Sequence, residues 1–599
     1  MTALVFILHL CSCSGTPPLQ VHVDAVHGND TNTGASLADA LRTTAAAARA
    51  VRELRTRAAT SAIDVVLQSG VYEHATPLEL DERDGGSSNV DSVRWRAADG
   101  AATPPRLVGG VLLRNLTWTA TARAADQTVW RADLPESLRA QLAAVDCGQI
   151  PSLFVDGHRM WRARWPNVDA TWPTIWGAGY TTASDGIGRL PCAFRSPEIT
   201  VVSATNPNAN GSCAIPQSRG YPAEPPTGLR VPTSALSPNA AQWNLSTSGL
   251  PPIVHVSVYA RPPGEAPFGP NNGYVWVQGN LQYTVASRAV SANHTTTSLN
   301  FQDGGGQVNS FSWVLGAANI QNGSRFFVEN AGLPELDARG EYVHDVDAHA
   351  LYLILPDGVT TTNLADLEIV AAISQRLLNV RSTAARRNNG LRKSRRDPWV
   401  QHLHFGPGLT FGMTAPTFLE IYESTGRGNN DWSIHRGASL FFEAVRDVSV
   451  QGCTIAHTGG NAIFISHAAE DIAVEDNMIG PEIGDSGVAI VGTLVRSNGL
   501  GGRNFPSRIS VARNRIHEIG VYGKQVTGVY VSVAGFVNVT DNVISGSPSS
   551  GIKVDDTFIG GHHFLYNHIY DTTREVTDMG GCVRVQSCCQ PQMSKSAWE

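Results

Sequence analysis

Residues 508–556 read RISVARNRIHEIGVYGKQVTGVYVSVAGFVNVTDNVISGSPSSGIKVDD, and this stretch decides the fold. It holds two copies of one pattern: an alternating strand, a polar corner, a short apolar pair, a turn that contains Gly, and a second alternating strand. Residues 447–466, 471–492 and 562–586 repeat the pattern. A unit that recurs in this way is typical of a solenoid, in which each repeat forms one coil and packs on its neighbours.

One corner column of the repeat is nearly constant. It consists of Cys453, Asn477, Asn514, Asn542 and Asn567, separated by 24, 37, 28 and 25 residues. A corner residue must accept a left-handed backbone, which Asn does better than most residues with a Cβ. Asn side chains stacked about 4.8 Å apart can also hydrogen-bond along the stack. A β-sandwich has regularly spaced strands too, but it does not predict this column.

The pattern therefore predicts an all-β fold in which residues 399–586 form a right-handed parallel β-helix, a solenoid. Side chains alternate between the two faces of a strand. Apolar residues such as Ile552 and Val554 are then expected to fill the interior, and Lys553 and Asp555 to lie on the outer face.

The sequence before residue 399 indicates an N-terminal β-rich region with one helix, followed by a large β-rich insertion. Residues 38–58 (ADALRTTAAAARAVRELRTRA) predict the helix, with Leu41, Ala45 and Val51 on its apolar stripe. The expected organisation is a signal peptide (1–15), an N-terminal cap with the first coils (16–110), the insertion (111–380), a basic loop (381–398), the β-helix (399–586) and an irregular tail (587–599).

Several features predict a secreted glycoprotein. The N-terminal sequence MTALVFILHLCSCSG has an apolar run followed by small residues, as secretory signal peptides do. Seven Asn-X-Ser/Thr sequons follow, and Cys192 and Cys213 could close a disulfide. The net charge of −7 argues against a nucleic-acid or membrane-surface partner. The sequence has no run of about 18 apolar residues, so we do not expect a membrane anchor. We expect a monomer.

Several blocks carry a family resemblance. They are VHVDAVHGNDTNTGASLADALRTTAAAARAVREL (21–54), DVVLQSGVYEHATPLEL (64–80), SLFVDGHRMWRARWPN (152–167), FFVENAGLPELDARGEYVHDVDAHALYLILP (326–356), GIKVDDTFIGG (551–561) and REVTDMGG (574–581). In this order they resemble the secreted right-handed β-helix proteins of the pectin-lyase-like superfamily, in particular glycoside hydrolase family 141. The family normally continues with further coils after REVTDMGG. Here CVRVQSCCQPQMSKSAWE follows, and we expect it to leave the last coil without a cap.

Three carboxylates are the candidate catalytic residues: Asp555, Asp556 and Asp578. A glycosidase needs two carboxyl groups, about 5–5.5 Å apart for retention and about 6.5–9.5 Å for inversion. The 23 residues from Asp555 to Asp578 are close to one coil, so the two carboxylates are expected on neighbouring coils. By resemblance, Asp578 and Asp556 occupy acidic positions of the family. Alternatively, all three are ordinary strand-end and turn residues.

Lys524, Tyr522 and Asp485 are the candidate substrate-binding residues. Lys524 could bind an acidic sugar or, in a lyase, remove the proton next to a uronate carboxylate; a surface loop lysine is the simpler interpretation. Tyr522 could stack on a sugar ring, and Asp485 shares a turn column with Asp578. No cofactor or metal site is expected, apart from Ca²⁺ bound by Asp555 and Asp556 if the protein is a lyase.

The sequence thus predicts a secreted carbohydrate-active protein that binds a polysaccharide, with glycoside hydrolysis by paired carboxylates as the leading hypothesis. A polysaccharide lyase acting on uronate polymers is the first alternative. A non-catalytic glycan-binding or cell-surface protein is the second, because β-helices host all three functions.

Overall fold

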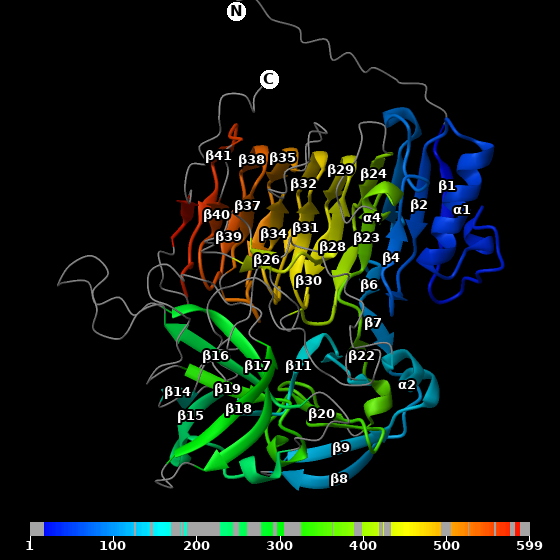
Figure 1. The fold of residues 1–599 in the computed structure, drawn as a ribbon. Coiled ribbons are helices and arrows are strands. Elements are labelled where there is room, and N and C mark those ends of the chain that lie inside the picture. The colour runs from blue at the N-terminus through cyan, green and yellow to red at the C-terminus, as the bar shows by residue number, and fades with distance from the viewer. Residues whose placement is uncertain are drawn as a thin grey trace, which may run out of the picture.

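The computed structural model describes residues 17–124, 127–143, 148–168, 181–182, 185–187, 228–243, 251–259, 277–290, 296–304, 325–361, 363–387, 398–417, 423–424, 433–492, 505–524, 526–555, 559–574 and 581–586. These residues form a stack of coils and a second β-rich body, which lies below the stack in Figure 1. No helix among them is long and apolar enough to cross a membrane.

Each coil adds one strand to each of three parallel sheets, here called A, B and C. Sheet A contains β1 (Leu19–Val23), β2 (Ile63–Leu67), β5 (Val93–Ala97), β24 (Val400–Phe405), β29 (Val445–Gln451), β32 (Glu470–Glu475), β35 (Ser507–Ala512), β38 (Gly535–Thr540) and β41 (His563–Leu565). Sheet B contains β3 (Val71–Glu73), β6 (Arg106–Val108), β25 (Thr410–Gly412), β30 (Thr454–Ala456), β33 (Met478–Ile479), β36 (Arg515–His517), β39 (Val543–Ser545) and β42 (His568–Ile569). Sheet C contains β4 (Leu78–Leu80), β23 (Leu378–Arg381), β28 (Ala438–Glu443), β31 (Asn461–Ser466), β34 (Val488–Val491), β37 (Val529–Ser532), β40 (Ile552–Asp555) and β43 (Val583–Gln586).

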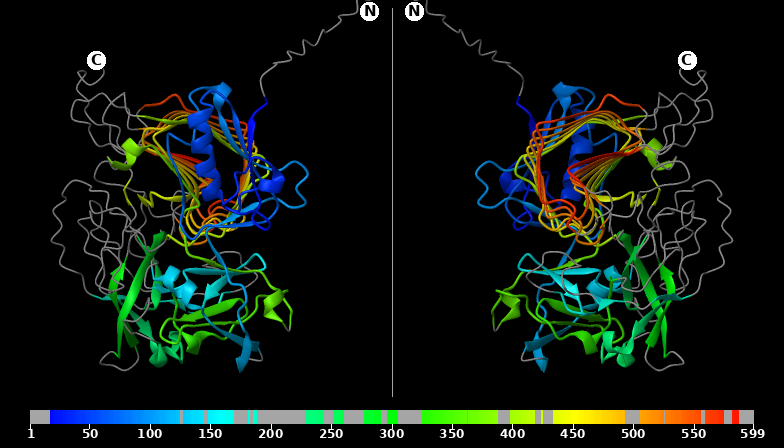
Figure 2. Two further views of the ribbon diagram at one scale, coloured as in Figure 1. Left: turned by 90° about the vertical axis from the view of Figure 1, so that its right-hand side faces the viewer. Right: turned by 90° about the vertical axis from the view of Figure 1, so that its left-hand side faces the viewer.

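We call this part the coil stack and number its coils 1 to 8 by their strands in sheet C, from β4 to β43. Figure 2 views it end-on, with the coils superimposed around one interior. The chain is mostly strand with several parallel sheets, consistent with a parallel β-helix. The expected inward residues lie in one continuous apolar core, where Val529 and Ile552 are fully buried.

The Asn column forms the predicted ladder. Asn514 Oδ1 accepts hydrogen bonds from the backbone N and from Nδ2 of Asn477, at 3.0 and 2.9 Å. Asn514 Nδ2 donates to Asn542 Oδ1 at 3.0 Å and to the Val474 carbonyl at 2.8 Å. The ladder continues from Asn542 to Asn567. Each buried amide thus joins three consecutive coils.

The expected backbone role of these Asn residues was wrong. The left-handed conformation belongs to the residue directly before each ladder Asn, for example Asp476 (φ 57°), Arg513 (φ 56°) and Asp541 (φ 57°). The preceding residue makes the turn, and the Asn that follows can therefore point its amide into the stack.

A second column, made of glycines, leaves space in the interior for isoleucine side chains. A Cβ on Gly528 would lie 2.5 Å from Ile544 Cγ2, and a Cβ on Gly551 would lie 2.3 Å from Ile569 Cγ2. Both glycines come directly before strands of sheet C, as Gly487 does one coil earlier. The absent side chains leave room for the isoleucines of sheet B.

The helix α1 (Thr44–Arg57) lies across the N-terminal opening of the coil stack (Figure 2). It begins later than predicted, because Thr43 caps it by accepting a hydrogen bond from the Ala46 backbone N at 3.1 Å. Ala47, Ala48 and Val51 form the buried face, whereas Ala45 is exposed, contrary to the predicted stripe.

The second body, here called the insertion, is the chain between β6 and β23 and therefore belongs to coil 2. Its first sheet contains β7 (Gly110–Leu112), β22 (Ile369–Ala372), β10 (Ser152–Val155), β11 (His158–Arg162), β20 (Glu341–Asp345), β21 (Ala350–Leu353), β9 (Gln127–Asp133) and β8 (Thr119–Ala124). Its second sheet contains β12 (Arg164–Trp165), β19 (Arg325–Glu329), β16 (Ile253–Tyr259), β17 (Val277–Val290), β18 (Thr296–Gly304), β15 (Gly228–Pro232) and β14 (Asp185–Ile187), with β13 (Thr181–Thr182) paired to β19. The short elements are α2 (Glu136–Leu142) in the insertion, α4 (Thr383–Arg387) after β23, and the pair β26 (Glu423–Ser424) and β27 (Ser433–Ile434) in coil 3.

Candidate functional site

The outer face of sheet C carries most of the described polar residues that are candidates for catalysis. Strand register places one outward ladder along the stack, from the N-terminal coils to the C-terminal coils: Glu79, Asn379, Phe441, Phe464, Ala489, Tyr530 and Lys553. A parallel ladder two residues further along each strand contains Arg381, Glu443, Ser466, Val491, Ser532 and Asp555. Side chains two residues apart lie on the same face of a strand, so both ladders share this face.

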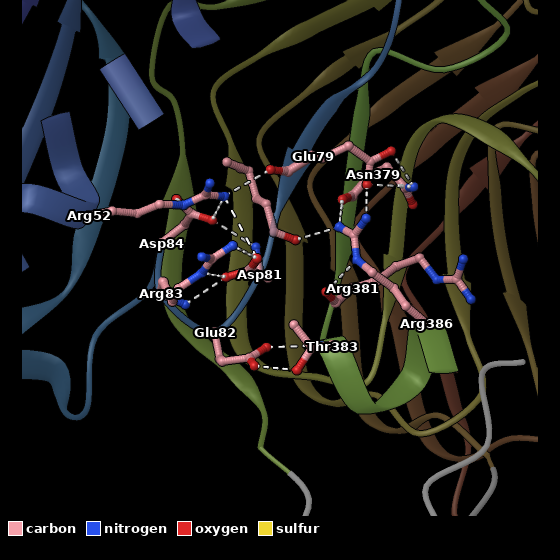
Figure 3. Close-up of polar contacts among 11 residues, drawn as sticks. Arg52, Glu79, Asp81, Glu82, Arg83, Asp84, Asn379, Arg381, Thr383 and Arg386 are labelled. Atoms are coloured by element: carbon pink, nitrogen blue, oxygen red, sulfur yellow. Dashed lines mark hydrogen bonds and ion pairs between the residues drawn. The ribbon is translucent and has the colours of Figure 1, made fainter. Parts of the chain in front are cut away.

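The first coils use their carboxylates to join neighbouring elements (Figure 3). Asp84 accepts hydrogen bonds from Arg52 of α1 at 2.8 and 2.6 Å. Glu79 accepts a hydrogen bond from Asn379 at 2.8 Å and pairs with Arg386 of α4. Arginine partners thus neutralise this acidic cluster and fasten the N-terminal coils.

In the middle coils, the outer face of sheet C is apolar and packs against β27. Phe441 and Phe464 stack with ring centroids 5.8 Å apart and pack with Ile434 of β27. Glu443 is buried beside them, where its Oε2 accepts from Arg381 Nε at 2.6 Å and its Oε1 accepts from the Ser466 hydroxyl at 2.9 Å. Burial alone would raise the pKa of Glu443, but the charges of its neighbours, Arg381 among them, hold it below its usual range. This carboxylate is therefore bound in an internal ion-pair network.

The last coils of the face place three chemically active side chains together, here called the outer-face cluster: Tyr530, Lys553 and Asp555. The Lys553 Nζ lies 3.5 Å from Asp555 Oδ2, and the Tyr530 hydroxyl lies 3.5 Å from the same oxygen. All three residues are buried, with exposures of 0 to 3%. Asp555 thus lies where the sequence predicts it, on the outer face of coil 7, but under other parts of the chain. Asp556 and Asp578 lie outside the described residues.

Register excludes two described carboxylates as catalytic partners of Asp555. Glu443 is four coils away, which at about 4.8 Å per strand is about 19 Å. Asp485 is two coils away, about 10 Å along the stack alone, with further displacement along the strands. Both separations exceed the range that glycosidases use.

The three predicted substrate-binding residues meet at one corner of the coil stack, where sheet B leads into sheet C. Asp485 belongs to this corner in coil 5, and Tyr522 and Lys524 belong to it in coil 6. The two turns pack directly, since the backbone N of Tyr522 donates to the Gly484 carbonyl at 2.9 Å. We call these three residues and Glu482 the corner cluster.

None of the three residues is a surface side chain, because their exposures are 1 to 4%. Asp485 Oδ2 accepts from the Thr417 hydroxyl at 3.2 Å, and a Cβ on Gly523 would lie 2.3 Å from Asp485 Oδ1. Lys524 Nζ donates to the Gly520 carbonyl at 2.7 Å. The interpretation of Lys524 as a surface lysine is wrong, because the turn folds back over its own ammonium group.

The insertion reaches this corner through Arg159, which sequence reasoning missed. Arg159 Nη1 donates to the Tyr522 hydroxyl at 3.2 Å, and Nε donates to Glu482 Oε2 at 3.0 Å. His457 Nδ1 lies 3.0 Å from the same Glu482 oxygen. Burial alone would raise the pKa of Glu482, but the hydrogen bond to His457 and the charge of Arg159 lower it to about 2. The available signal was the run HRMWRARW (158–165), in which three arginines stand among apolar residues.

No group of three or more His, Cys, Asp or Glu side chains that could hold a metal ion occurs in the part of the chain that the structure describes. The predicted Ca²⁺ alternative involves Asp556, which lies outside that part.

Comparison with solved structures establishes the fold. A structure named "Glycoside hydrolase" matches with a TM-score of 0.61 and 15% sequence identity, over 95% of this chain and 88% of that chain. A complex of XylC with xylose matches with a TM-score of 0.38 and 11% identity, over 95% of this chain and 64% of that chain. At its low identity the first likeness shows a shared fold alone. No protein-family model and no curated protein matches the sequence.

Proposed function

We propose that the protein is a secreted glycoside hydrolase that cleaves a polysaccharide at the C-terminal end of sheet C. The position of Asp555 carries the proposal, because its carboxylate stands on the outer face beside Tyr530 and Lys553. The other described carboxylates of this face are Glu79, which is held by Arg386, and Glu443, which is held by Arg381. The shared fold with a structure named as a glycoside hydrolase supports the reaction class.

The second carboxylate is Asp578, with Asp556 as the alternative member of the pair. Asp578 lies in the chain between β42 and β43, and β43 pairs with β40, which carries Asp555. Neighbouring coils stand about one strand spacing apart, close to the separation that retaining glycosidases use. The roles of acid and of nucleophile or base stay unassigned between the two.

The finer family placement is part of the proposal. We take the coil stack to be a right-handed β-helix of the pectin-lyase-like superfamily, similar to glycoside hydrolase family 141. The protein would be an extracellular glycoprotein and a monomer that needs no cofactor. The exposed position of the sequon residue Asn538 on sheet A supports glycosylation on a face away from the site.

A polysaccharide lyase is the second candidate, because Lys553 lies beside Asp555. Elimination from a uronate needs a base next to the sugar carboxylate, and a lysine amine can fill that role. Lys524 at the corner cluster is the other candidate base.

One assay separates the candidates. The purified protein is incubated with a panel of neutral and uronate polysaccharides, while new reducing ends and the ultraviolet absorbance of unsaturated products are recorded. The proposal expects reducing ends without that absorbance. Absorbance that rises with the reducing ends would establish a lyase, and neither signal on any polysaccharide of the panel would contradict both enzymatic candidates.

A further inference from the structure

Arg159 lies close to the turn of the β10–β11 hairpin of the insertion, paired with Phe154, and contacts three consecutive coils of the stack. Its Nη2 donates to the Thr458 carbonyl of coil 4 at 3.1 Å and to the Glu482 carbonyl of coil 5 at 3.2 Å. Nε reaches the Glu482 carboxylate, and Nη1 reaches the Tyr522 hydroxyl of coil 6. One side chain of the insertion, which belongs to coil 2, thus contacts the corners of coils 4, 5 and 6.

Two aromatic rings pack against the guanidinium of Arg159. Its carbon lies 4.9 Å from the ring centroid of Phe154 and 5.5 Å from that of Tyr522. The side chain is 1% exposed. Arginine suits this position because its planar group can stack on rings and donate several hydrogen bonds at once, whereas lysine offers a single point charge.

The two turns that Arg159 holds are those of the corner cluster. Glu482 precedes Asp485 by three residues, and Tyr522 precedes Lys524 by two. The turns are also bonded to each other, because the backbone N atoms of Tyr522 and Gly523 donate to the Gly484 carbonyl at 2.9 and 3.0 Å. A shift of either turn would therefore move Asp485 and Lys524 together.

We propose that Arg159 is a positioning residue, which sets the corner cluster of coils 5 and 6 relative to the outer-face cluster. The proposal rests on the proposed function, since it assigns Arg159 to the same site. Among the described residues Arg159 contacts Glu482 and Tyr522 of the corner cluster and not the outer-face cluster, so the proposed effect would pass through these two residues. Through Arg159 the insertion is accordingly anchored to the coil stack at the corners of coils 4, 5 and 6.

The first test compares Arg159→Met with Arg164→Met. Arg164 is equally buried, and its described contacts, such as Nε to the Pro166 carbonyl at 2.8 Å and its guanidinium over the Phe327 ring, lie within the insertion. On the polysaccharide that the wild type cleaves, Arg159→Met should lower kcat about 10- to 100-fold, because small displacements of reacting groups have effects of this size. Arg164→Met should lower the melting temperature and leave kcat of the folded protein unchanged.

Two further variants identify the route of the effect. Arg159→Lys should recover part of kcat, because the ammonium group reaches only some of the acceptors. Tyr522→Phe should lower kcat, and the double variant with Arg159→Met should be no slower than the slower single variant, because both changes remove one linkage. Independent multiplication of the two effects would contradict this route.

Hydrogen exchange separates failure of this proposal from failure of the proposed function. If the wild type cleaves no polysaccharide, the proposed function is wrong, and the positioning claim is judged by exchange alone. Arg159→Met should then speed exchange of the Tyr522 and Gly523 amides well beyond Arg164→Met. Unchanged exchange at these amides together with an unchanged kcat would overturn the positioning role.

Discussion

Replacement of one ladder residue, Asn514→Ala, should destabilise the coil stack strongly. The Asn514 side chain makes four hydrogen bonds in a buried site, two as acceptor from Asn477 and two as donor to Val474 and Asn542. Its removal leaves the Asn477 backbone N–H without this acceptor. Asn477 Nδ2 loses one of its two acceptors and keeps the Val450 carbonyl, and the Val474 carbonyl and Asn542 Oδ1 each lose one donor. A buried polar group left unsatisfied costs about 1–3 kcal/mol.

The expected loss for Asn514→Ala is therefore about 3–4 kcal/mol, because one group loses its acceptor and three others are left partly satisfied. Cys453→Ala is the matched control at the head of the same column. The Cys453 thiol reaches the Phe405 and Gln451 carbonyls only at 3.6 and 3.5 Å, and its backbone N, which donates to Asn477, is retained. The control should lose about 1–2 kcal/mol, mainly through the small cavity.

The assay is urea unfolding followed by circular dichroism, with wild type and both variants at one protein concentration. If the amide hydrogen bonds stabilise the stack, Asn514→Ala should lower the unfolding midpoint clearly more than Cys453→Ala does. Equal decreases would refute it, since the amide would then contribute no more than its volume.

Three further predictions concern packing, pH and modification. Gly528→Ala should lower the free energy of unfolding by about 1–3 kcal/mol in the same urea assay, because the new Cβ would lie 2.5 Å from Ile544 Cγ2, whereas Gly581→Ala, whose Cβ would meet no atom within 4 Å, should have little effect. Glu482 has a pKa lowered from 4.5 to about 2 in the folded protein, so its stabilisation is present above about pH 4.5 and is lost as the pH falls toward 2. At pH 7 the free energy of unfolding of the wild type should be about 2 kcal/mol larger than that of Glu482→Gln, after allowance for the 34% exposure of the Glu482 side chain. This difference in stability should disappear near pH 2. Expression in a eukaryotic secretory pathway should add a glycan at the exposed Asn538, seen as a mass that Asn538→Gln lacks; an unmodified Asn538 in secreted protein would contradict the expectation.

The parts of the fold that the sequence predicts are those that repeat. The Asn column fixes the register of coils 4 to 8, because the same local pattern returns with each coil and every copy supports the others. The inward position of Ile552 and Val554 follows from strand alternation alone.

The junction between insertion and coil stack could not be predicted in this way. Arg159 and Glu482 are 323 residues apart in sequence. Glu482 lies in a repeated coil, whereas Arg159 lies in the insertion, outside the repeat. The burial of Lys524 was missed for a related reason: a Gly- and Lys-containing turn resembles a surface loop until the packing of its neighbours is known. Similarly, the left-handed residue Arg513 has a side chain that does not mark it as a turn former, and Asp541 is no stronger a turn former than the Asn that follows it.

The most direct test of the central claim measures reducing-end release by wild type, Asp555→Asn, Asp578→Asn and Asp471→Asn on one cleaved polysaccharide. Asp471 is the control, because it lies on sheet A, exposed and paired with Arg508 at 2.6 Å. One or both of the first two variants should lose at least about 100-fold in kcat, as removal of a catalytic acid or base does, while Asp471→Asn should keep the wild-type rate. Wild-type rates in both Asp555→Asn and Asp578→Asn would contradict the account, because the reaction would then not depend on carboxylates at this end of sheet C.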